Sequence, residues 1–185
     1  VLDKKDGEIL LLSEYGLDAQ PFDTSGKSRV DWKDSTIRKW LNDDFYNSAF
    51  SEKEKENIVE SKSEGFEEYN TSMNLTGGGK PYAYLEREIE DKVFLLSNTE
   101  LCAYFSEDPY PGCYSDPYAH KELLCYPTAY AKQQLETRYQ TETCGWWLCN
   151  HVYEDDSVEL VSAYGQGSGT SRENIKANTK SIAVR

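Results

Sequence analysis

The chain has 185 residues, a length that suits one domain with a hydrophobic core of its own. It carries 20 Lys and Arg against 33 Asp and Glu, a formal net charge of −13, which excludes an electrostatic grip on nucleic acid or anionic lipid. Aromatic residues make up 13% of the chain, and because disordered acidic chains are poor in aromatics, the composition predicts a folded domain.

The first half of the chain predicts short strands and a central helix. Two apolar runs with polar boundaries, residues 8–13 and 91–97, predict buried strands that are neighbours in the core. Between them, apolar residues recur at helical spacing from Ile37 to Ala49 behind Ser35, a good N-cap residue. We therefore expect an amphipathic helix there, with its apolar side on the core.

Two helix starts are expected from capping boxes, in which a Ser is followed three positions later by a Glu. Ser51 with Glu54 begins a short charged helix, and Ser97 with Glu100 begins another. A further helix is expected to open at Pro127 and to end near Arg138, because good helix formers fill this stretch.

The C-terminal part predicts β-structure. Residues 145–148, 157–163 and 181–184 form short apolar runs typical of strands, and the Gly-rich residues 165–169 predict a turn. Loops are expected at 65–81 and 108–116. The apolar anchors of their segments should be largely buried: Trp40, Phe94, Trp146 and Leu148.

Catalytic and metal motifs are weak in this sequence. The two histidines, His120 and His151, do not form a metal-ligand pair. Five cysteines lie in the second half, and buried thiols or one or two structural disulfides both remain open. A Ca²⁺ site is a minor alternative to a solvated turn at three consecutive carboxylates, which lack the alternating calcium-loop pattern: Glu154, Asp155 and Asp156.

Tyrosines are the most suggestive surface feature. Several crowd a Pro-rich region, where an exposed ring would offer an apolar face and a polar tip to sugars or protein partners. The alternative is that they pack a long loop onto the domain. These tyrosines are Tyr104, Tyr110, Tyr114, Tyr118 and Tyr126.

Five segments in order resemble a bacterial domain of unknown function, DUF6273, which is related to C-type-lectin-like and formylglycine-generating-enzyme-like folds. They span nearly the whole chain: residues 10–18, 35–50, 91–97, 127–131 and 145–148. The chain departs from the family where Cys149-Asn150 stands in place of the usual Arg-Ser. It also lacks the calcium motifs of animal lectins and the Gly-Gly-Ser-Trp segment of the formylglycine-generating branch.

The resemblance implies a single α+β domain over residues 1–185, C-type-lectin-like, with short helices on a small, twisted, mostly antiparallel sheet. The chain opens on Val1, so we expect it to be part of a larger protein. The expected function is a non-catalytic module that recognises a glycan or a protein, on a secreted or cell-surface bacterial protein. A structural spacer is the alternative, and an oxidase is the least favoured.

The oxidase alternative would need two close cysteines that bind copper. Cys144 and Cys149 are the only near pair in the second half, but alternation along a strand would point them to opposite faces. No cofactor is therefore expected.

The predicted ligand site lies on the loops beside the late strands, where amides, carboxylates, a guanidinium and aromatic rings come together. A partner held by charge should be basic or neutral, given the net charge of −13, and binding to a basic partner should weaken as salt rises. The expected residues are Asn150, His151, Tyr153, Glu154, Asp156, Tyr164, Gln166 and Arg172, with Tyr110 and Tyr114 as an aromatic neighbour.

Overall fold

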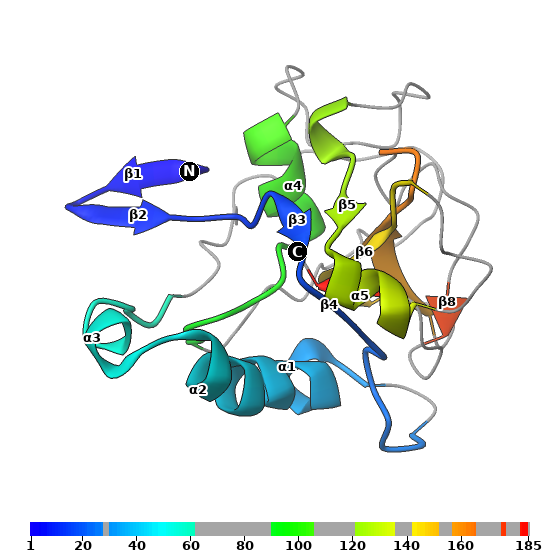
Figure 1. The fold of residues 1–185 in the computed structure, drawn as a ribbon, viewed down its shortest axis with the longest axis horizontal. Coiled ribbons are helices and arrows are strands. Elements are labelled where there is room, and N and C mark those ends of the chain that lie inside the picture. The colour runs from blue at the N-terminus through cyan, green and yellow to red at the C-terminus, as the bar shows by residue number, and fades with distance from the viewer. Residues whose placement is uncertain are drawn as a thin grey trace, which may run out of the picture.

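The computed structural model is an α+β structure built around one five-stranded sheet (Figure 1). The structure describes residues 1–27, 30–61, 90–105, 121–135, 142–151, 157–165, 175–176 and 182–184. The strands are β1 Asp3–Lys5, β2 Glu8–Leu10, β3 Tyr15–Gly16, β4 Asp18–Gln20, β5 Tyr126–Pro127, β6 Trp146–His151, β7 Ser157–Val161, β8 Ile175–Lys176 and β9 Ile182–Val184. The helices are η1 Trp32–Asp34, α1 Thr36–Trp40, η2 Leu41–Phe45, α2 Tyr46–Ala49, α3 Glu52–Lys55, α4 Asn98–Phe105, η4 Lys121–Leu123 and α5 Ala129–Gln134.

The sheet has the strand order β4-β9-β6-β7-β8. The pairs β4–β9, β6–β7 and β7–β8 are antiparallel, and β6–β9 is parallel. The expectation of a small, mostly antiparallel sheet with short helices is therefore confirmed. Late-strand positions were also predicted well: β7 and β9 fall within two of the expected runs, and β6 begins inside the third, 145–148, but continues to His151.

The central strand β6 is buried on both faces from Trp146 to Cys149, which fits the unbroken apolar sequence of these four residues. Trp147 and Cys149 belong to one hydrophobic cluster, while Trp146 and Leu148 belong to a second. Phe94 packs against both clusters. The two clusters are thus the two sides of one sheet.

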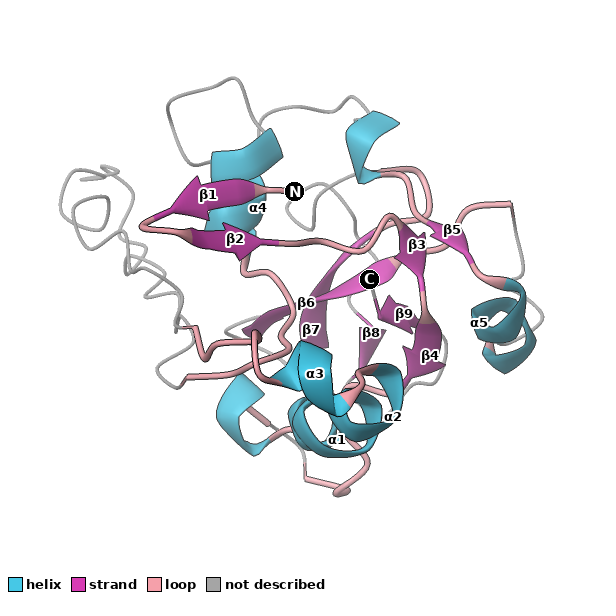
Figure 2. Ribbon diagram, turned by 60° about the vertical axis from the view of Figure 1, so that its left-hand side comes forward, coloured by secondary structure: helices cyan, strands magenta, loops and turns pink. Residues whose placement is uncertain are grey.

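A helical layer covers the first side (Figure 2). It runs through α1, η2 and α2, and it begins where Ser35 accepts a hydrogen bond from the Arg38 N–H at 3.2 Å, as the N-cap pattern predicts. Ile37 and Leu41 point from this layer into the cluster that contains Trp147. The segment Leu41–Phe45 is wound as a π-helix inside the run.

The second side is covered by α4 and by the segment around β5 and α5. Leu101 of α4, Leu123 and Leu135 pack there against Trp146 and Leu148. Both predicted capping boxes are present: Ser51 with Glu54, and Ser97 with Glu100, whose carboxylate accepts the Ser97 N–H at 2.7 Å. The helix expected from Pro127 begins at Ala129 and ends at Gln134, before the expected end.

The expected buried strand at residues 8–13 is wrong. β2 occupies only Glu8–Leu10 and pairs with β1 in a hairpin that projects from the body, as both ribbon views show. Ile9 is 56% exposed, and only the end of the run, at Leu12, packs against the core. The hairpin turns at Asp6 and Gly7, both with positive φ, and an Asp-Gly pair is a strong hairpin signal.

The expected strand at residues 91–97 is also wrong, although Leu95 and Leu96 are buried as expected. A side chain satisfies the backbone near its start: the Asn42 carboxamide accepts from the N–H groups of Lys92 and Val93 and donates to the Val93 carbonyl. Strand β6 adds a single backbone bond, from the Cys149 N–H to the Leu96 carbonyl at 3.0 Å. An extended segment held in this way does not need a strand ladder.

Burial of the four apolar anchors is confirmed for Trp146 and Leu148, whereas Trp40 and Phe94 are only partly buried. Trp40 packs part of its surface against Phe45, with ring centroids 5.3 Å apart. The predicted loops at 65–81 and 108–116 lie outside the described residues. Among the described helices, none is long and apolar enough to cross a membrane.

Candidate functional site

Most of the ligand site predicted from the sequence lies outside the described residues. This holds for Tyr110, Tyr114, Tyr153, Glu154, Asp155, Asp156, Gln166 and Arg172. The proposed site and its Ca²⁺ alternative at residues 154–156 therefore stay predictions. Within the described residues, no group of three or more His, Cys, Asp or Glu side chains is arranged to hold a metal ion.

The three remaining residues of the predicted site do not lie together. Asn150 and His151 end β6, where His151 pairs with Val158. Tyr164 follows β7, beyond Val161, which pairs with Trp146 at the other end of the same hairpin. Because a strand advances about 3.3 Å per residue, the length of the hairpin separates Tyr164 from His151.

The structure brings together a different set of aromatic residues. β3 and β5 pair in parallel, and Tyr15 stands directly beside Tyr126. Paired residues of neighbouring strands point to the same face, and these two side chains are 49% and 45% exposed. Two tyrosine rings from segments 111 positions apart are thus displayed side by side.

A third exposed tyrosine lies on α5, a helix that is fastened to β3. The Thr128 N–H donates to the Gly16 carbonyl at 2.9 Å, and its hydroxyl donates to the Leu17 carbonyl at 3.3 Å. The same hydroxyl caps α5 by accepting from the Ala131 N–H. Tyr130, in the first turn of α5, is 59% exposed.

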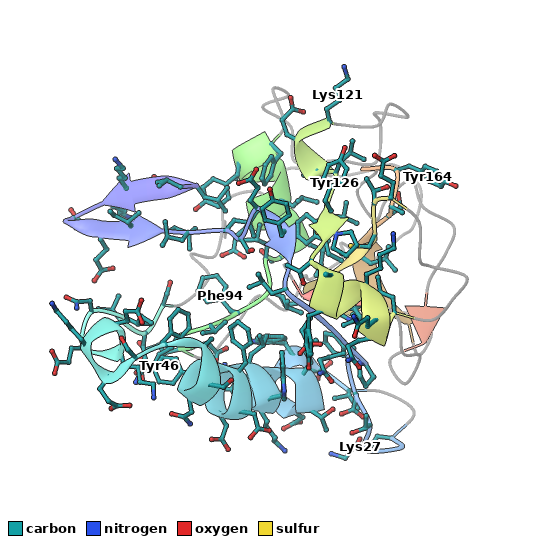
Figure 3. All side chains as sticks on the ribbon, viewed as in Figure 1. Lys27, Tyr46, Phe94, Lys121, Tyr126 and Tyr164 are labelled. Atoms are coloured by element: carbon teal, nitrogen blue, oxygen red, sulfur yellow. The ribbon has the colours of Figure 1, made fainter. Side chains whose placement is uncertain are left out.

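Tyr164 is tied to the other side of β5. Cys125, just before Tyr126, pairs with Cys144, and the neighbouring Thr143 hydroxyl donates to the Ala163 carbonyl at 2.7 Å. Tyr164 comes next in the chain and is the most exposed large hydrophobic residue described, at 75%. Figure 3 shows Tyr126 and Tyr164 on the same side of the molecule.

We call these four residues, with the exposed Leu17, the tyrosine surface: Tyr15, Leu17, Tyr126, Tyr130 and Tyr164. Sequence reasoning singled out Tyr126 and Tyr164 but missed Tyr15 and Tyr130. A weak signal was present, since two of the family-like segments, 10–18 and 127–131, contain them. The pairing of β3 with β5 could not be read from either segment alone.

A buried charged cluster around Asp91 resembles a functional site, but its contacts stabilise the fold. The Asp91 carboxylate accepts from the Trp32 Nε1–H at 2.9 Å and from the Arg38 Nε–H at 2.8 Å. The Asp91 backbone also exchanges hydrogen bonds with Ser61. All its oxygens point into these contacts, so the cluster fastens the segment at residue 91 to η1 and α1.

Among the described residues, the carboxyl group of Glu54 has a shifted pKa. The Ser51 hydroxyl, and after it the Ser51 backbone N–H, donates to Glu54, and these bonds lower the pKa of Glu54 from its ordinary value of 4.5. Glu54 lies in the first turn of the exposed helix α3, far along the chain from the tyrosine surface. The shift belongs to a helix cap and marks no acid–base chemistry.

The two cysteines of the oxidase alternative are both buried, on different sides of the sheet. Cys149 belongs to the cluster of Trp147, and Cys144 to that of Trp146. Their separation follows the alternation expected along β6. A copper site shared by this pair would require the sheet itself to be rebuilt.

A family model described as a domain of unknown function, DUF6273, matches residues 6–185. The chain belongs to the DUF6273 family. No curated protein and no solved structure matches this DUF6273 chain at a significant level. The match covers the hairpin turn at Asp6, all three segments of the tyrosine surface and the C-terminal strand β9.

Proposed function

We propose that this DUF6273 chain is a non-catalytic module that recognises a glycan or a protein ligand. The observation that carries the proposal is the tyrosine surface, above all the side-by-side pair of Tyr15 and Tyr126. Exposed aromatic residues gathered from three segments of chain are costly to leave in water. Such a patch is typical of an interaction site.

Tyrosine suits this role for physical reasons. Its ring offers a flat apolar face, against which the C–H face of a sugar or an aliphatic side chain can pack, and its hydroxyl supplies a hydrogen bond at the edge. Only two side-chain torsions are fixed on binding, so little conformational entropy is lost. Tyr15 and Tyr126 are further held by strand pairing, which orders their backbone before any ligand arrives.

The loops beside the late strands form the second part of the proposed site. Tyr164 belongs to both parts, because it is in the predicted loop set and also adjoins the β5 segment. Gln166 and Arg172 follow it in the chain and would add an amide and a guanidinium to the tyrosines. Asn150 and His151, at the other end of the β6–β7 hairpin, would belong to a separate contact.

The proposal includes a fold and a setting. The arrangement of helices around a small twisted sheet, with recognition on its connecting loops, is what a C-type-lectin-like domain would have. The setting is a secreted or cell-surface bacterial protein with further domains in the same parent chain. No Ca²⁺ or other cofactor is part of the proposed recognition.

Two other functions are weaker. A spacer would not need tyrosines gathered on one surface, and the tyrosine surface therefore favours a binding module. An oxidase that resembles the formylglycine-generating enzyme would need two accessible, adjacent cysteines. Cys144 and Cys149, buried on opposite sides of the sheet, argue against that chemistry at this pair.

The test is a glycan array with the isolated chain, together with a pull-down from cell-surface extract, followed by a titration with the ligand found. The double variant Tyr15→Ala/Tyr126→Ala should weaken binding at least about tenfold, the usual effect of removing central aromatic anchors. Tyr126→Phe keeps the ring and should lose less. Val59→Ala, at an exposed apolar residue that follows α3, is the control and should bind as the unaltered chain does.

The two parts of the site can be told apart by a second variant, Tyr153→Ala/Tyr164→Ala/Arg172→Ala. If only this triple variant loses affinity, recognition belongs to the late loops and not to the Tyr15–Tyr126 pair. If both variants fold and both retain full affinity, the tyrosine surface and the late loops are removed from consideration. A chain that binds nothing in either screen favours the spacer.

A further inference from the structure

Cys125 and Cys144 face each other across two antiparallel segments. They are directly opposite residues in the pairing, and the Cys144 N–H donates to the Cys125 carbonyl at 2.8 Å. The Cys144 Sγ–H donates to that same carbonyl at 3.5 Å. The Cys144 sulfur therefore already lies against the backbone of Cys125.

This pairing meets the distance requirement for a disulfide. Because the Cys144 N–H bonds to the Cys125 carbonyl, this is a hydrogen-bonded pair, whose Cα atoms lie about 5.5 Å apart, within the range of about 4.4–6.8 Å that disulfides span. Both side chains belong to the same hydrophobic cluster, on the side of the sheet that contains Trp146. The pairing is also short and lies outside the named strands, so the backbone can make the small approach that a sulfur–sulfur bond needs.

We propose that Cys125 and Cys144 are a redox pair that a small-molecule disulfide, such as oxidised glutathione, converts into a cross-strand disulfide. The structure holds both residues as thiols. One cysteine, as its thiolate, attacks a sulfur of the small disulfide, forms a mixed disulfide and releases one small thiolate. The second cysteine attacks the protein sulfur of that mixed disulfide and releases the other.

The reaction consumes two protein thiols and one small disulfide, and it forms one protein disulfide and two small thiols. The cysteine pair is oxidised by two electrons, and the small disulfide is reduced by two. The two protons that leave the cysteines are taken up by the released thiolates. Burial sets the rate, because exchange must wait for a local opening around Cys125 and Cys144.

The disulfide would close a loop over residues 126–143, which includes β5 and α5. Tyr126 and Tyr130 lie on that loop, and Thr143 at its end is bonded to the Ala163 carbonyl beside Tyr164. Oxidation would therefore restrain the backbone that carries Tyr126 and Tyr130, and through Thr143 the backbone beside Tyr164. The proposed bond does not depend on what the tyrosine surface binds.

The stabilisation expected from the disulfide follows from the length of the loop that it closes. A cross-link over a loop of this size restricts the unfolded chain enough to raise Tm by about 6–12 °C for a domain of this length. Cys149 is the matched control cysteine, because it is equally buried but on the other side of the sheet, in the cluster of Trp147. Cys149→Ala should leave the oxidation and its Tm rise unchanged, whereas Cys144→Ala should abolish both.

The experiment incubates the whole chain with oxidised glutathione at pH 8, once in buffer and once in urea below the unfolding transition. Remaining thiols are alkylated, the protein is digested, and linked peptides are identified by mass spectrometry. We expect a peptide pair joined through Cys125 and Cys144, which dithiothreitol separates, and the rise in Tm. Absence of this peptide pair in both incubations, a glutathione adduct alone, or linkage of either cysteine to Cys102, Cys113 or Cys149 would overturn the proposal; the mapping needs no variant to fold.

Discussion

Replacing Asp91 by Ala tests whether the buried cluster holds the first side of the core together. The change removes the acceptor for the Trp32 Nε1–H and for the Arg38 Nε–H in one step. Trp32 is buried, so its N–H would be left without a partner, while Arg38 would lose its counter-ion. The backbone bridge between residue 91 and Ser61 can remain, because it uses no side-chain atom.

The expected cost is about 3–4 kcal/mol. A hydrogen bond to a charged group contributes about 1.5–3 kcal/mol, and breaking a buried ion pair by removing one partner costs about 3–5 kcal/mol. The Arg38 side chain is 24% exposed, so water screens part of its charge, and the lower end of that range applies. Asp91→Asn keeps an acceptor oxygen and should cost about half as much.

Urea unfolding followed by tryptophan fluorescence measures this loss directly. The control is Glu52→Ala, which breaks the Lys55–Glu52 ion pair of 2.9 Å at a carboxylate that is 89% exposed and should cost less than about 1 kcal/mol. Combining Asp91→Ala with Arg38→Met should cost less than the two single changes added, because the double variant leaves no unpaired arginine charge behind. If the free energy of unfolding of Asp91→Ala lies within about 1 kcal/mol of that of the unaltered chain, the proposed role of this cluster is refuted.

Gly145→Ala should destabilise the chain by about 1–3 kcal/mol. The added Cβ would lie 2.9 Å from the Val161 carbonyl oxygen, a backbone atom that cannot turn away. An unfolding midpoint in urea equal to that of the unaltered chain would contradict this prediction. The contribution of the Ser51–Glu54 cap to the stability of the chain should depend on pH. The lowered pKa of Glu54 means that its contribution is present above the ordinary value of 4.5 and is lost as pH falls through the lower value of the folded state. Ser51→Ala should remove that contribution, so the two stability curves, measured by thermal unfolding, should converge in acid; parallel curves would disprove the assignment.

Local signals in the sequence predicted the elements whose stability is local. Both capping boxes and the Ser35 cap need only residues three positions apart, and all three are present. The apolar run at Trp146 also correctly predicted a strand. A strand buried on both faces shows a continuous apolar run and no alternation with polar residues. In each case the information lies within a few neighbouring residues.

The two failures have different physical causes: a partner far along the chain explains the first, and a neighbouring turn explains the second. The run 91–97 has the composition of a strand, yet Asn42, about 50 residues earlier, takes up the backbone groups of Lys92 and Val93. The run at Ile9 was expected in the core, but the turn at Asp6 and Gly7 folds it onto β1 instead. Apolar content alone cannot distinguish these outcomes.

The same long-range contacts explain why the tyrosine surface could not be predicted from its parts. Tyr15 and Tyr126 become neighbours only when β3 pairs with β5, and that pairing depends on Thr128, which bonds Gly16 and Leu17 while it caps α5. The contacts that display the rings are therefore made by the backbone and by the Thr128 side chain. Truncation of an exposed ring should accordingly leave Tm nearly unchanged. A loss of affinity without a loss of stability is then the signature of recognition, whereas a Thr128→Ala variant should lower both together.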